Sequence, residues 1–574
     1  MIPTTASGTA PAASAFVPAD LDAARWENLA PLYQALLDRK VDGADGLRRL
    51  LLDRSELDSA ASETQTNLYI NMTCHTDDEQ IKAAYLDFVE RVEPKLKEAG
   101  FELDRKIVGS PHADGLDRRR HEVLLRDLQA DVEIFRQENI PLQTEETKLD
   151  QQYEETCGAM TVDFRGEERT LPQMARFLEE TDRATREEAW RGIWERRYRD
   201  HERLSEIFDR LVGLRAQVAR NSGFASFRDY MFKRKHRFDY APADCEAFHR
   251  AAEEVCVPVL RRLNARRREA LGVDSLRPWD LAVDSRGRPP LRPFDGAEEL
   301  IEKTSRLFHR MEPSLGTMFD SLRGGDCLDL DSRKGKAPGG YQAHRDRSRK
   351  PFIFMNAAGL HRDLETMVHE AGHAFHSILC NDEPLLYYRH SPLEFAEVAS
   401  MSMELLSFPY LGEFYDEAQV ARAKRERLED LSALLPWVAT IDAFQHWIYT
   451  HPEDSRDERT AHWLELDERF GAAVSWDGIE HYRQMSWQRQ GHLFGVPFYY
   501  IEYGIAQLGA LQLWLQFKAD RSGAIENYRR ALRLGGSRPL PELFEAAELT
   551  FDFGPDTVKR LMDEVQRELD TLPL

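Results

Sequence analysis

The apolar residues of this chain recur mostly at the three- and four-residue spacing of amphipathic helices. Residues 19 to about 270 show this spacing almost throughout, for example in Asp182–Arg220. After a loop over residues 272–298 that is rich in glycine and proline, helical spacing returns in Glu298–Leu322 and again from Asp363 to the C-terminus. The pattern predicts a mainly α fold.

One region predicts strands. Gly335–Tyr341 has the composition of a turn, and Pro351–Asn356 is a short run of apolar and β-forming residues. We expect a small sheet over about residues 327–356, with a hairpin beside a peptide-binding groove.

Composition and charge argue against several classes of protein. The 574 residues are 42% hydrophobic and 10% aromatic, which is typical of a globular protein and not of a disordered one. The formal net charge of −23 argues against a nucleic-acid partner, because such a protein needs a basic surface. No run of about 18 apolar residues predicts a membrane span.

Cysteine usage predicts a reducing compartment. The six cysteines are scattered and form no CxxC pair, so we expect free thiols and a cytoplasmic protein. The first eighteen residues lack the basic and apolar segments of a signal peptide, and we expect them to form a mobile tail.

The sequence His369-Glu370-Ala371-Gly372-His373 is an HExxH pentapeptide within a predicted helix, Asp363–Cys380. Two histidines four residues apart lie on one face of a helix, so both imidazoles can reach one ion. Zinc binds imidazole nitrogen, and a catalytic zinc site keeps one position for water. Glu370 lies beside the first ligand, where its carboxylate can take a proton from that water. The pentapeptide therefore predicts a catalytic zinc site.

Chance or a structural histidine pair could also produce HExxH in a chain with 18 His and 100 Asp and Glu. The apolar positions around the pentapeptide argue against this, because a buried helix gains little from three polar side chains without an ion. They are Leu364, Met367, Val368, Ala371, Phe375, Ile378 and Leu379. Gly372 costs roughly 1 kcal/mol in a helix relative to alanine, which indicates a close approach of backbone or substrate.

The third protein ligand must come from elsewhere. His376 lies about 10.5 Å along the helix from His369 and is expected to be a core histidine or an outer neighbour of the site. The next predicted helix follows Ser391-Pro392 and carries three glutamates at helical spacing: Glu394, Glu397 and Glu404. Two histidines and a glutamate make a common zinc site, and spacing alone leaves all three glutamates open.

A second polar cluster combines His492 with Tyr499, Tyr500 and Tyr503. Neutral imidazole and phenol groups can stabilise the oxyanion of a tetrahedral intermediate. The alternative is an aromatic stripe of the core. We favour function because a zinc site is predicted in the same chain.

HExxH followed by Glu-x-x-Ser, here Glu397–Ser400, resembles the thimet-oligopeptidase and oligoendopeptidase-F group of zinc metallopeptidases. Glu397 follows His369 by 28 residues and His373 by 24, which suits this group. Four other stretches are similar to the oligoendopeptidase-F branch: Leu276–Asp280, Gly339–Tyr341, Phe352–Asn356 and Phe551–Phe553. The resemblance extends from about residue 20 to the C-terminus.

The resemblance implies one Zn²⁺ per chain, held by His369, His373 and Glu397. It also implies a two-lobed helical body with a deep channel and zinc on its floor. We expect three parts: a mobile tail (1–18), an N-terminal helical domain (19–180) and a helical zinc-peptidase domain (181–574).

The resemblance further implies roles for the second cluster and for the glycine turn. Glu370 is the expected general base, and Tyr500, with His492 beside it, the expected oxyanion donor. Tyr500 and Tyr503 match two later tyrosines of the relatives' loop with one residue fewer after the histidine, and Val496-Pro497 replaces an additional tyrosine. The expected substrate contacts are Gly339, Gly340, Tyr341, Phe354 and Tyr499.

We therefore expect a zinc oligoendopeptidase whose partners are short unfolded peptides, and no pattern in the chain predicts an oligomeric state. One alternative is a zinc carboxypeptidase or dipeptidyl carboxypeptidase similar to angiotensin-converting enzyme. Another is a non-catalytic peptide-binding zinc protein, against which Glu370 argues, because a structural site has no use for a base.

Overall fold

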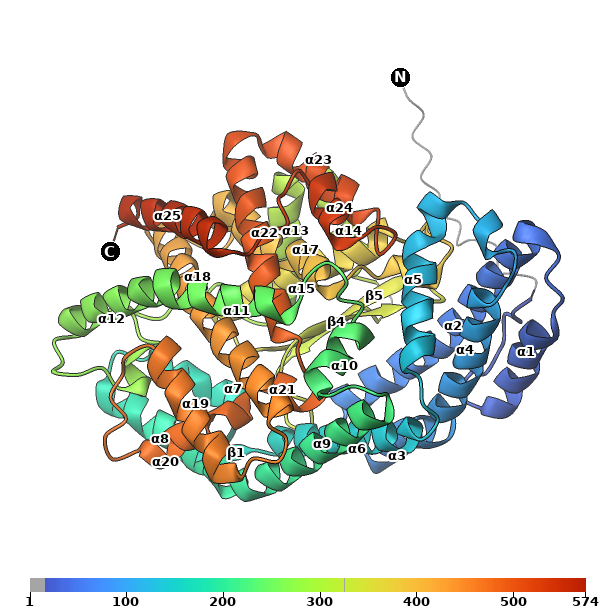
Figure 1. The fold of residues 1–574 in the computed structure, drawn as a ribbon. Coiled ribbons are helices and arrows are strands. Elements are labelled where there is room, and N and C mark those ends of the chain that lie inside the picture. The colour runs from blue at the N-terminus through green and yellow to red at the C-terminus, as the bar shows by residue number, and fades with distance from the viewer. Residues whose placement is uncertain (1–15, 325, 574) are drawn as a thin grey trace.

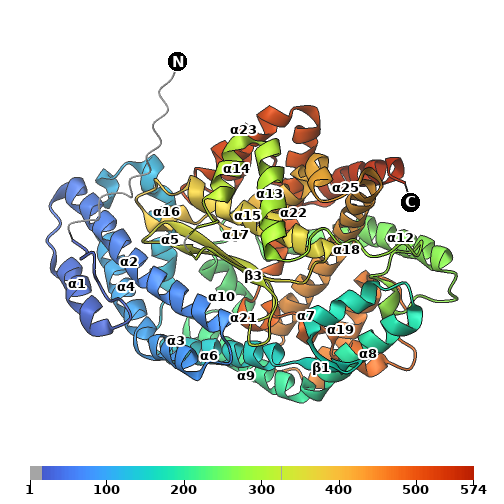
Figure 2. The same cartoon turned by 180° about the vertical axis from the view of Figure 1, so that it is seen from behind.

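The computed structural model describes residues 16–324 and 326–573, and helices make up most of it, which confirms the predicted mainly α class (Figure 1). Of the expected tail, residues 1–15 lie outside the described part of the chain. The helices α1, α2, α4 and α5 group at one end of the molecule in both views (Figure 2). Their apolar side chains form a core of their own, drawn almost entirely from residues 17–128.

The elements of the first half are α1 (Trp26–Asp38), α2 (Gly43–Cys74), α3 (Glu79–Arg91), α4 (Glu93–Val108), α5 (Arg118–Ile134), α6 (Asn139–Gly158), β1 (Thr161–Phe164), β2 (Glu167–Thr170), α7 (Leu171–Met174), α8 (Arg183–Arg199), α9 (His201–Asn221), α10 (Phe227–Arg234), α11 (Pro242–Ala251), α12 (Val257–Leu271), α13 (Ala297–Met311) and α14 (Pro313–Asp320). Residues 272–296 contain one short 3-10 turn, Pro278–Asp280, and no other helix or strand.

The second half contains β3 (Leu328–Asp331), β4 (Tyr341–Arg345), β5 (Lys350–Ala357), α15 (His361–Leu379), α16 (Leu386–Arg389), α17 (Leu393–Leu406), α18 (Glu417–Thr450), α19 (Arg456–Phe470), α20 (Glu480–Gln484), α21 (His492–Gly495), α22 (Tyr500–Ala519), α23 (Arg521–Leu532), α24 (Leu540–Ala546) and α25 (Pro555–Thr571).

Two local expectations were wrong. Residues 161–170, expected to be helical, form the β1–β2 hairpin, whose turn places Arg165 and Gly166 at φ 57° and 83°. Glycine adopts such angles without strain, so an Arg-Gly turn between alternating residues was the missed signal. The helix expected over Glu298–Leu322 is divided into α13 and α14 because Pro313 lacks the N–H that would continue it.

The predicted small sheet is present, in the order β3-β5-β4. β4 and β5 form the expected antiparallel hairpin, with Tyr341 opposite Phe354 and Arg345 opposite Lys350, and β3 pairs with β5 in parallel. The central strand β5 packs against α15, the helix that carries HExxH. β4 lies at an edge of the sheet, where its outer backbone groups can accept another strand.

The core of the second half is built on α17, which packs between α15 and α22 (Figure 1). Nearly every residue of α17 is buried, its glutamates included. Glycines allow both contacts. A Cβ on Gly372 of α15 would lie 2.5 Å from the Ala399 carbonyl oxygen and 2.6 Å from Ser400 Cα, and a Cβ on Gly509 of α22 would lie 2.8 Å from Val398 Cγ2. The close approach expected at Gly372 is therefore that of the α17 backbone.

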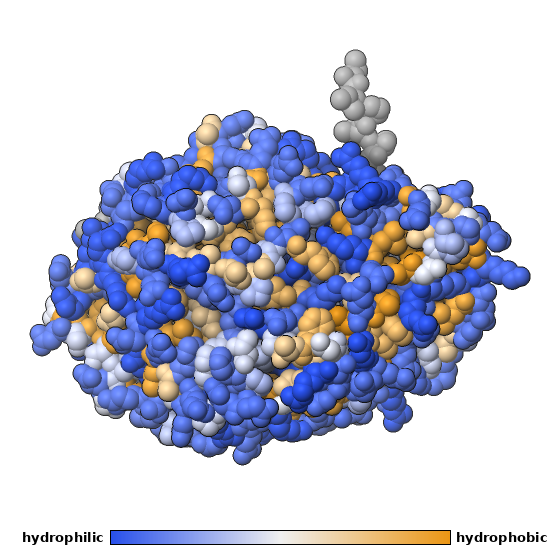
Figure 3. Space-filling model, in the orientation of Figure 1, coloured by the Kyte–Doolittle hydropathy of each residue, from blue (hydrophilic) through white to orange (hydrophobic). Residues whose placement is uncertain are grey.

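Hydrophilic residues cover most of the face shown in Figure 3, and apolar residues are scattered between them. Within residues 16–324 and 326–573, every helix is too short or too polar to cross a membrane.

Gly372→Ala tests the contact between α15 and α17. The added methyl group would meet backbone, which cannot rotate away, and overpacking of this kind costs about 1–3 kcal/mol. We expect the free energy of unfolding in urea to fall by this amount. Gly213→Ala in α9 is the matched control, because a Cβ there meets nothing within 4 Å. Equal stability of the two variants would contradict the close contact.

Candidate active site

The two histidines of HExxH and Glu397 converge on one point. On α15, the imidazoles of His369 and His373 have ring centroids 5.0 Å apart. Glu397 Oε2, from α17, lies 3.4 Å from His369 Nε2 and 3.5 Å from His373 Nε2. A four-coordinate zinc ion at roughly 2.0–2.2 Å from each donor keeps neighbouring donors about 3.3–3.6 Å apart. The three side chains therefore have the spacing and the chemistry of a zinc site.

Contacts separate the three glutamates between which spacing could not choose. Glu394 accepts a hydrogen bond from Tyr240 at 2.6 Å and lies away from both imidazoles. Glu404 accepts a hydrogen bond from His369 Nδ1 at 2.6 Å and forms an ion pair with Arg427. A carboxylate on Nδ1 fixes the tautomer of the ring and points Nε2 toward the metal position. Glu397 alone of the three faces both Nε2 atoms.

The electrostatics of the cluster favour a cation. Burial alone would lower the pKa of His369, but the carboxylates of Glu397 and Glu404 hold it well above its ordinary value. Burial alone would raise the pKa of Glu397, but the two imidazoles hold it well below its ordinary value. Positive charge between these groups is strongly stabilised, and a divalent ion would supply it.

Glu370 lies beside the metal position without a partner of its own. Its Oε2 is buried and has no hydrogen-bond partner, and burial raises its pKa against the opposing effect of the two histidines. A Cβ on Gly340 would lie 3.8 Å from Glu370 Oε1, so the glycine turn passes directly over this carboxylate. A buried, unpartnered carboxylate in this position can accept a proton from water.

His376 does not join the cluster. Its Nε2 is buried without a hydrogen-bond partner, and burial lowers its pKa to about 3. It is a neutral histidine of the core, in agreement with its distance along the helix from His369.

The start of α22 brings two of the three tyrosines to the metal ligands. Tyr499 donates a hydrogen bond to Oε1 of Glu397. The Tyr503 hydroxyl lies 3.1 Å from His492 Nε2, and the charges of Glu397 and Glu370 both raise its pKa after burial. Tyr503 lies four positions after Tyr499, so the two side chains share a helix face.

The hydroxyl of Tyr500 points elsewhere. It donates to Gln490 Oε1 at 3.0 Å and accepts from Trp437 Nε1 at 3.1 Å. Gln490 Nε2 in turn donates to His492 Nδ1 at 2.7 Å, so the proton of the neutral imidazole is on Nε2, facing Tyr503. Burial lowers the pKa of His492 to about 4, which keeps the ring neutral. The Tyr503 hydroxyl therefore accepts from His492, and it also interacts with the hydroxyl of Tyr499.

The expected substrate contacts divide into two groups. Gly339 and Gly340 border the site, and Asn356 Nδ2 holds the turn through the Gly339 carbonyl at 2.9 Å. The Phe354 side chain is fully buried and stacks on Tyr341 with ring centroids 4.8 Å apart. The side chain of Phe354 therefore cannot contact a substrate, because this strand is covered on both faces.

Comparison with known proteins identifies the family of this chain. The sequence pattern of Peptidase family M3 matches residues 176–559, and that of the Peptidase M3 N-terminal domain matches residues 16–135. The chain belongs to peptidase family M3.

Individual members confirm the resemblance to the oligoendopeptidase-F branch. The chain is 27% identical to the oligoendopeptidase F homolog of Borreliella burgdorferi over 50% of its length, and 23% identical to oligopeptidase PepF of Bacillus subtilis over 68%. These matches span 49% and 60% of the two relatives. The solved structure of PZ peptidase A with inhibitor 2 superposes with a TM-score of 0.92 at 29% identity, covering 96% of this chain and 98% of that one.

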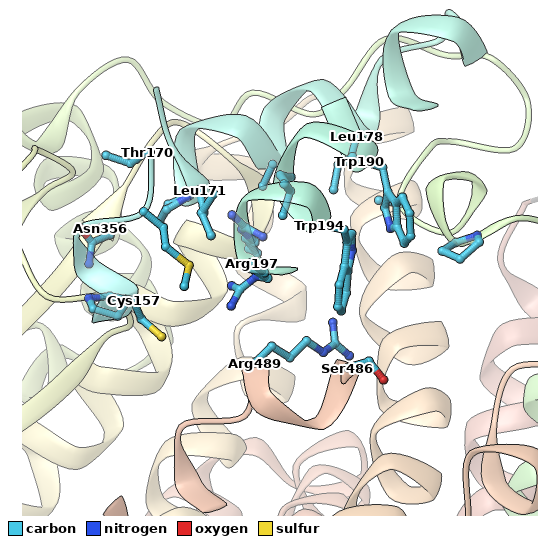
Figure 4. A pocket seen from close by; sticks show the side chains of 18 of the residues that line it. Cys157, Thr170, Leu171, Leu178, Trp190, Trp194, Arg197, Asn356, Ser486 and Arg489 are labelled. Atoms are coloured by element: carbon cyan, nitrogen blue, oxygen red, sulfur yellow. The ribbon is translucent and has the colours of Figure 1, made fainter. Parts of the chain in front are cut away.

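A cavity of about 550 Å³ lies near this site, and the metal ligands do not line it. Figure 4 shows part of its lining. Trp437, which holds Tyr500, borders it, and so do Asn356 and Pro338 beside the glycine turn. Arg197 and Arg489 also line it, and neither forms an ion pair with any residue of the described chain. Burial, and then the charge of Arg197, lowers the pKa of Arg489.

Sequence reasoning did not find Arg427, Trp437, Arg489 and Gln490. Arg489 and Gln490 had a weak signal, since they lie three and two positions before His492. Arg427 and Trp437 had none, because their partners Glu404 and Tyr500 come from other helices.

Proposed function

We propose that this chain is a zinc-dependent oligoendopeptidase that hydrolyses internal bonds of short, unfolded peptides. The observation that carries the proposal is the convergence of His369, His373 and Glu397 at zinc-ligand spacing, with the unpartnered carboxylate of Glu370 beside them. Five cysteines with free thiols, at positions 74, 157, 245, 256 and 380, support a cytoplasmic location.

His369, His373 and Glu397 would hold the ion, and Glu404 would keep the His369 ring oriented. When bound, zinc supplies a Lewis acid for the attacking water and the scissile carbonyl. Glu370 takes the proton from the water and returns it to the leaving amine, and its raised pKa brings it nearer to neutral pH, where proton transfer is most efficient.

Tyr503 is our candidate for the principal oxyanion donor. His492 donates to its oxygen, so its own phenol proton is not committed to His492, and the charges of Glu397 and Glu370 act on it directly. Tyr500 would act through Gln490, which fixes the tautomer of His492. Tyr499 would hold the second oxygen of Glu397, so that the ligand keeps its orientation.

Peptide binding would use the edge of the small sheet. A substrate in extended form can pair with β4 and pass the Gly339-Gly340 turn above Glu370, which requires an unfolded chain. The neighbouring cavity, with its aromatic walls and two arginines, offers room for side chains next to the cleaved bond.

A dipeptidyl carboxypeptidase is the second candidate. The unpaired cations Arg197 and Arg489 favour it, because a guanidinium group can bind the C-terminal carboxylate of a peptide. An enzyme that depends on this contact would not cleave peptides with an amidated C-terminus.

Mass spectrometry of a peptide library, half of it amidated at the C-terminus, tests the reaction. We expect cleavage at internal bonds in both halves, and we expect a chelator to abolish this cleavage.

Glu370→Gln should retain zinc but lose at least about 10²-fold in rate, since it removes the general base. Glu298→Gln, at an exposed position of α13, is the control. Near-wild-type turnover by Glu370→Gln would rule out its role. Cleavage restricted to dipeptides from free carboxyl ends would favour the second candidate.

Comparison of Tyr503→Phe with Tyr500→Phe tests the assignment of the oxyanion donor. We expect Tyr503→Phe to lower kcat by about 10²–10³-fold with little change in KM, because the donor acts on the transition state. Tyr500→Phe removes only a positioning contact and should cost much less. A larger loss of kcat in Tyr500→Phe would reverse the assignment.

A further inference from the structure

A second cluster of metal-binding side chains lies between α11 and α18, outside the site described above. α11 contributes Cys245 and His249, and α18 contributes Asp442 and His446, so each helix supplies two residues one turn apart. One donor atom each from Cys245, Asp442 and His446 lies within 4.8 Å of the others. Cys245 and Asp442 are fully buried, and the two histidines are 6% and 7% exposed.

Hydrogen bonding within the protein leaves this cluster incomplete. Asp442 Oδ2 accepts from His249 Nε2 at 2.8 Å. Asp442 Oδ1 and His446 Nδ1 have no hydrogen-bond partner among the described residues, and His446 Nε2 makes only an ion-pair contact, 3.3 Å from Asp442 Oδ2. A buried polar atom without a partner costs about 1–3 kcal/mol, so two of them at one place are unusual.

A simple ion-pair network between Asp442 and the two histidines explains only part of this arrangement. It accounts for Oδ2 of Asp442 and for Nε2 of His446, but not for Oδ1 of Asp442, for Nδ1 of His446 or for a thiol within reach of both residues. Burial, and then the charge of Asp442, raises the pKa of Cys245, so the group is a neutral thiol when no cation is present. A divalent cation would give a partner to each of these atoms.

We propose that Cys245, Asp442 and His446 bind a second divalent cation of the zinc class, with a structural role. Thiolate, imidazole and carboxylate together are typical ligands of zinc. Oδ1 of Asp442 is the oxygen available to the ion, because His249 holds Oδ2 and thereby orients the carboxylate. Binding would release the thiol proton of Cys245 to solvent. This inference does not depend on the proposed peptidase function.

The position of the cluster indicates what the ion would stabilise. The ring of His446 packs against Phe498 with centroids 5.6 Å apart, and the neighbouring Gln445 Oε1 accepts a hydrogen bond from the Phe498 N–H at 2.5 Å. Phe498 has φ 62°, a strained angle for a residue with a side chain, and it directly precedes Tyr499. An ion between α11 and α18 would brace the turn from which the tyrosines reach the active site.

Cobalt substitution tests the proposal independently of catalysis. A cobalt(II) ion bound by thiolate shows a charge-transfer absorption in the near ultraviolet, which the His369, His373 and Glu397 site cannot produce. We expect the full-length protein loaded with Co²⁺ to show this band, Cys245→Ser to lose it and Cys256→Ser to retain it. Cys256 is the matched control, because it is equally buried but lies outside the cluster.

Absence of the band in the wild-type protein would overturn the proposal without any variant. Its persistence in Cys245→Ser would overturn it as well. Asp442→Asn is a second test, because it keeps the shape of the side chain but removes the charge. We expect it to require at least tenfold more Co²⁺ for half-maximal absorption, and an unchanged titration would contradict the site.

Discussion

The contact between α15 and α17 is the constraint on which the candidate active site depends. Gly372 lies between the two histidines on α15. Its missing side chain lets the α17 backbone come so close that a Cβ on Gly372 would lie 2.5 Å from the Ala399 carbonyl oxygen and 2.6 Å from Ser400 Cα. Glu397 precedes Ser400 by less than one helical turn, so this approach places its carboxylate opposite both imidazoles. The Ser400 hydroxyl donates to Glu397 Oε2 at 3.0 Å, which gives Glu-x-x-Ser a physical role beside HExxH.

Further contacts orient two of the three proposed ligands, His369 and Glu397. Glu404 and Arg427 fix the ring of His369 from behind, and Tyr499 holds the free oxygen of Glu397. Such outer contacts decide ligand orientation and therefore metal affinity. Arg427 opposes the charge of Glu404, but without an ion the charge of Glu397 would be opposed only by protons on the two imidazoles. A cation between these groups would stabilise the site, and under the proposed function it would also supply the Lewis acid for hydrolysis.

The sequence predicted what depends on local geometry. HExxH on an apolar helix needs only the helical repeat to bring His369 and His373 together, and the α class follows from the spacing of apolar residues. The choice of Glu397 depended on the resemblance, because spacing cannot tell which face of α17 meets α15. Tyr500 was the expected oxyanion donor, whereas we propose Tyr503. Packing sets the rotation of α22 about its axis, so the sequence alone does not show which tyrosine faces the metal ligands. Phe354 was expected to contact substrate. Its side chain is buried against Tyr341, and the sequence alone does not show this packing.

Anomalous scattering at the zinc edge, from crystals of the active protein, tests the central claim most directly. We predict a peak within coordination distance of His369 Nε2, His373 Nε2 and Glu397, and its loss in crystals of Glu397→Ala. A map from active, zinc-containing crystals without a peak at this position would contradict the account.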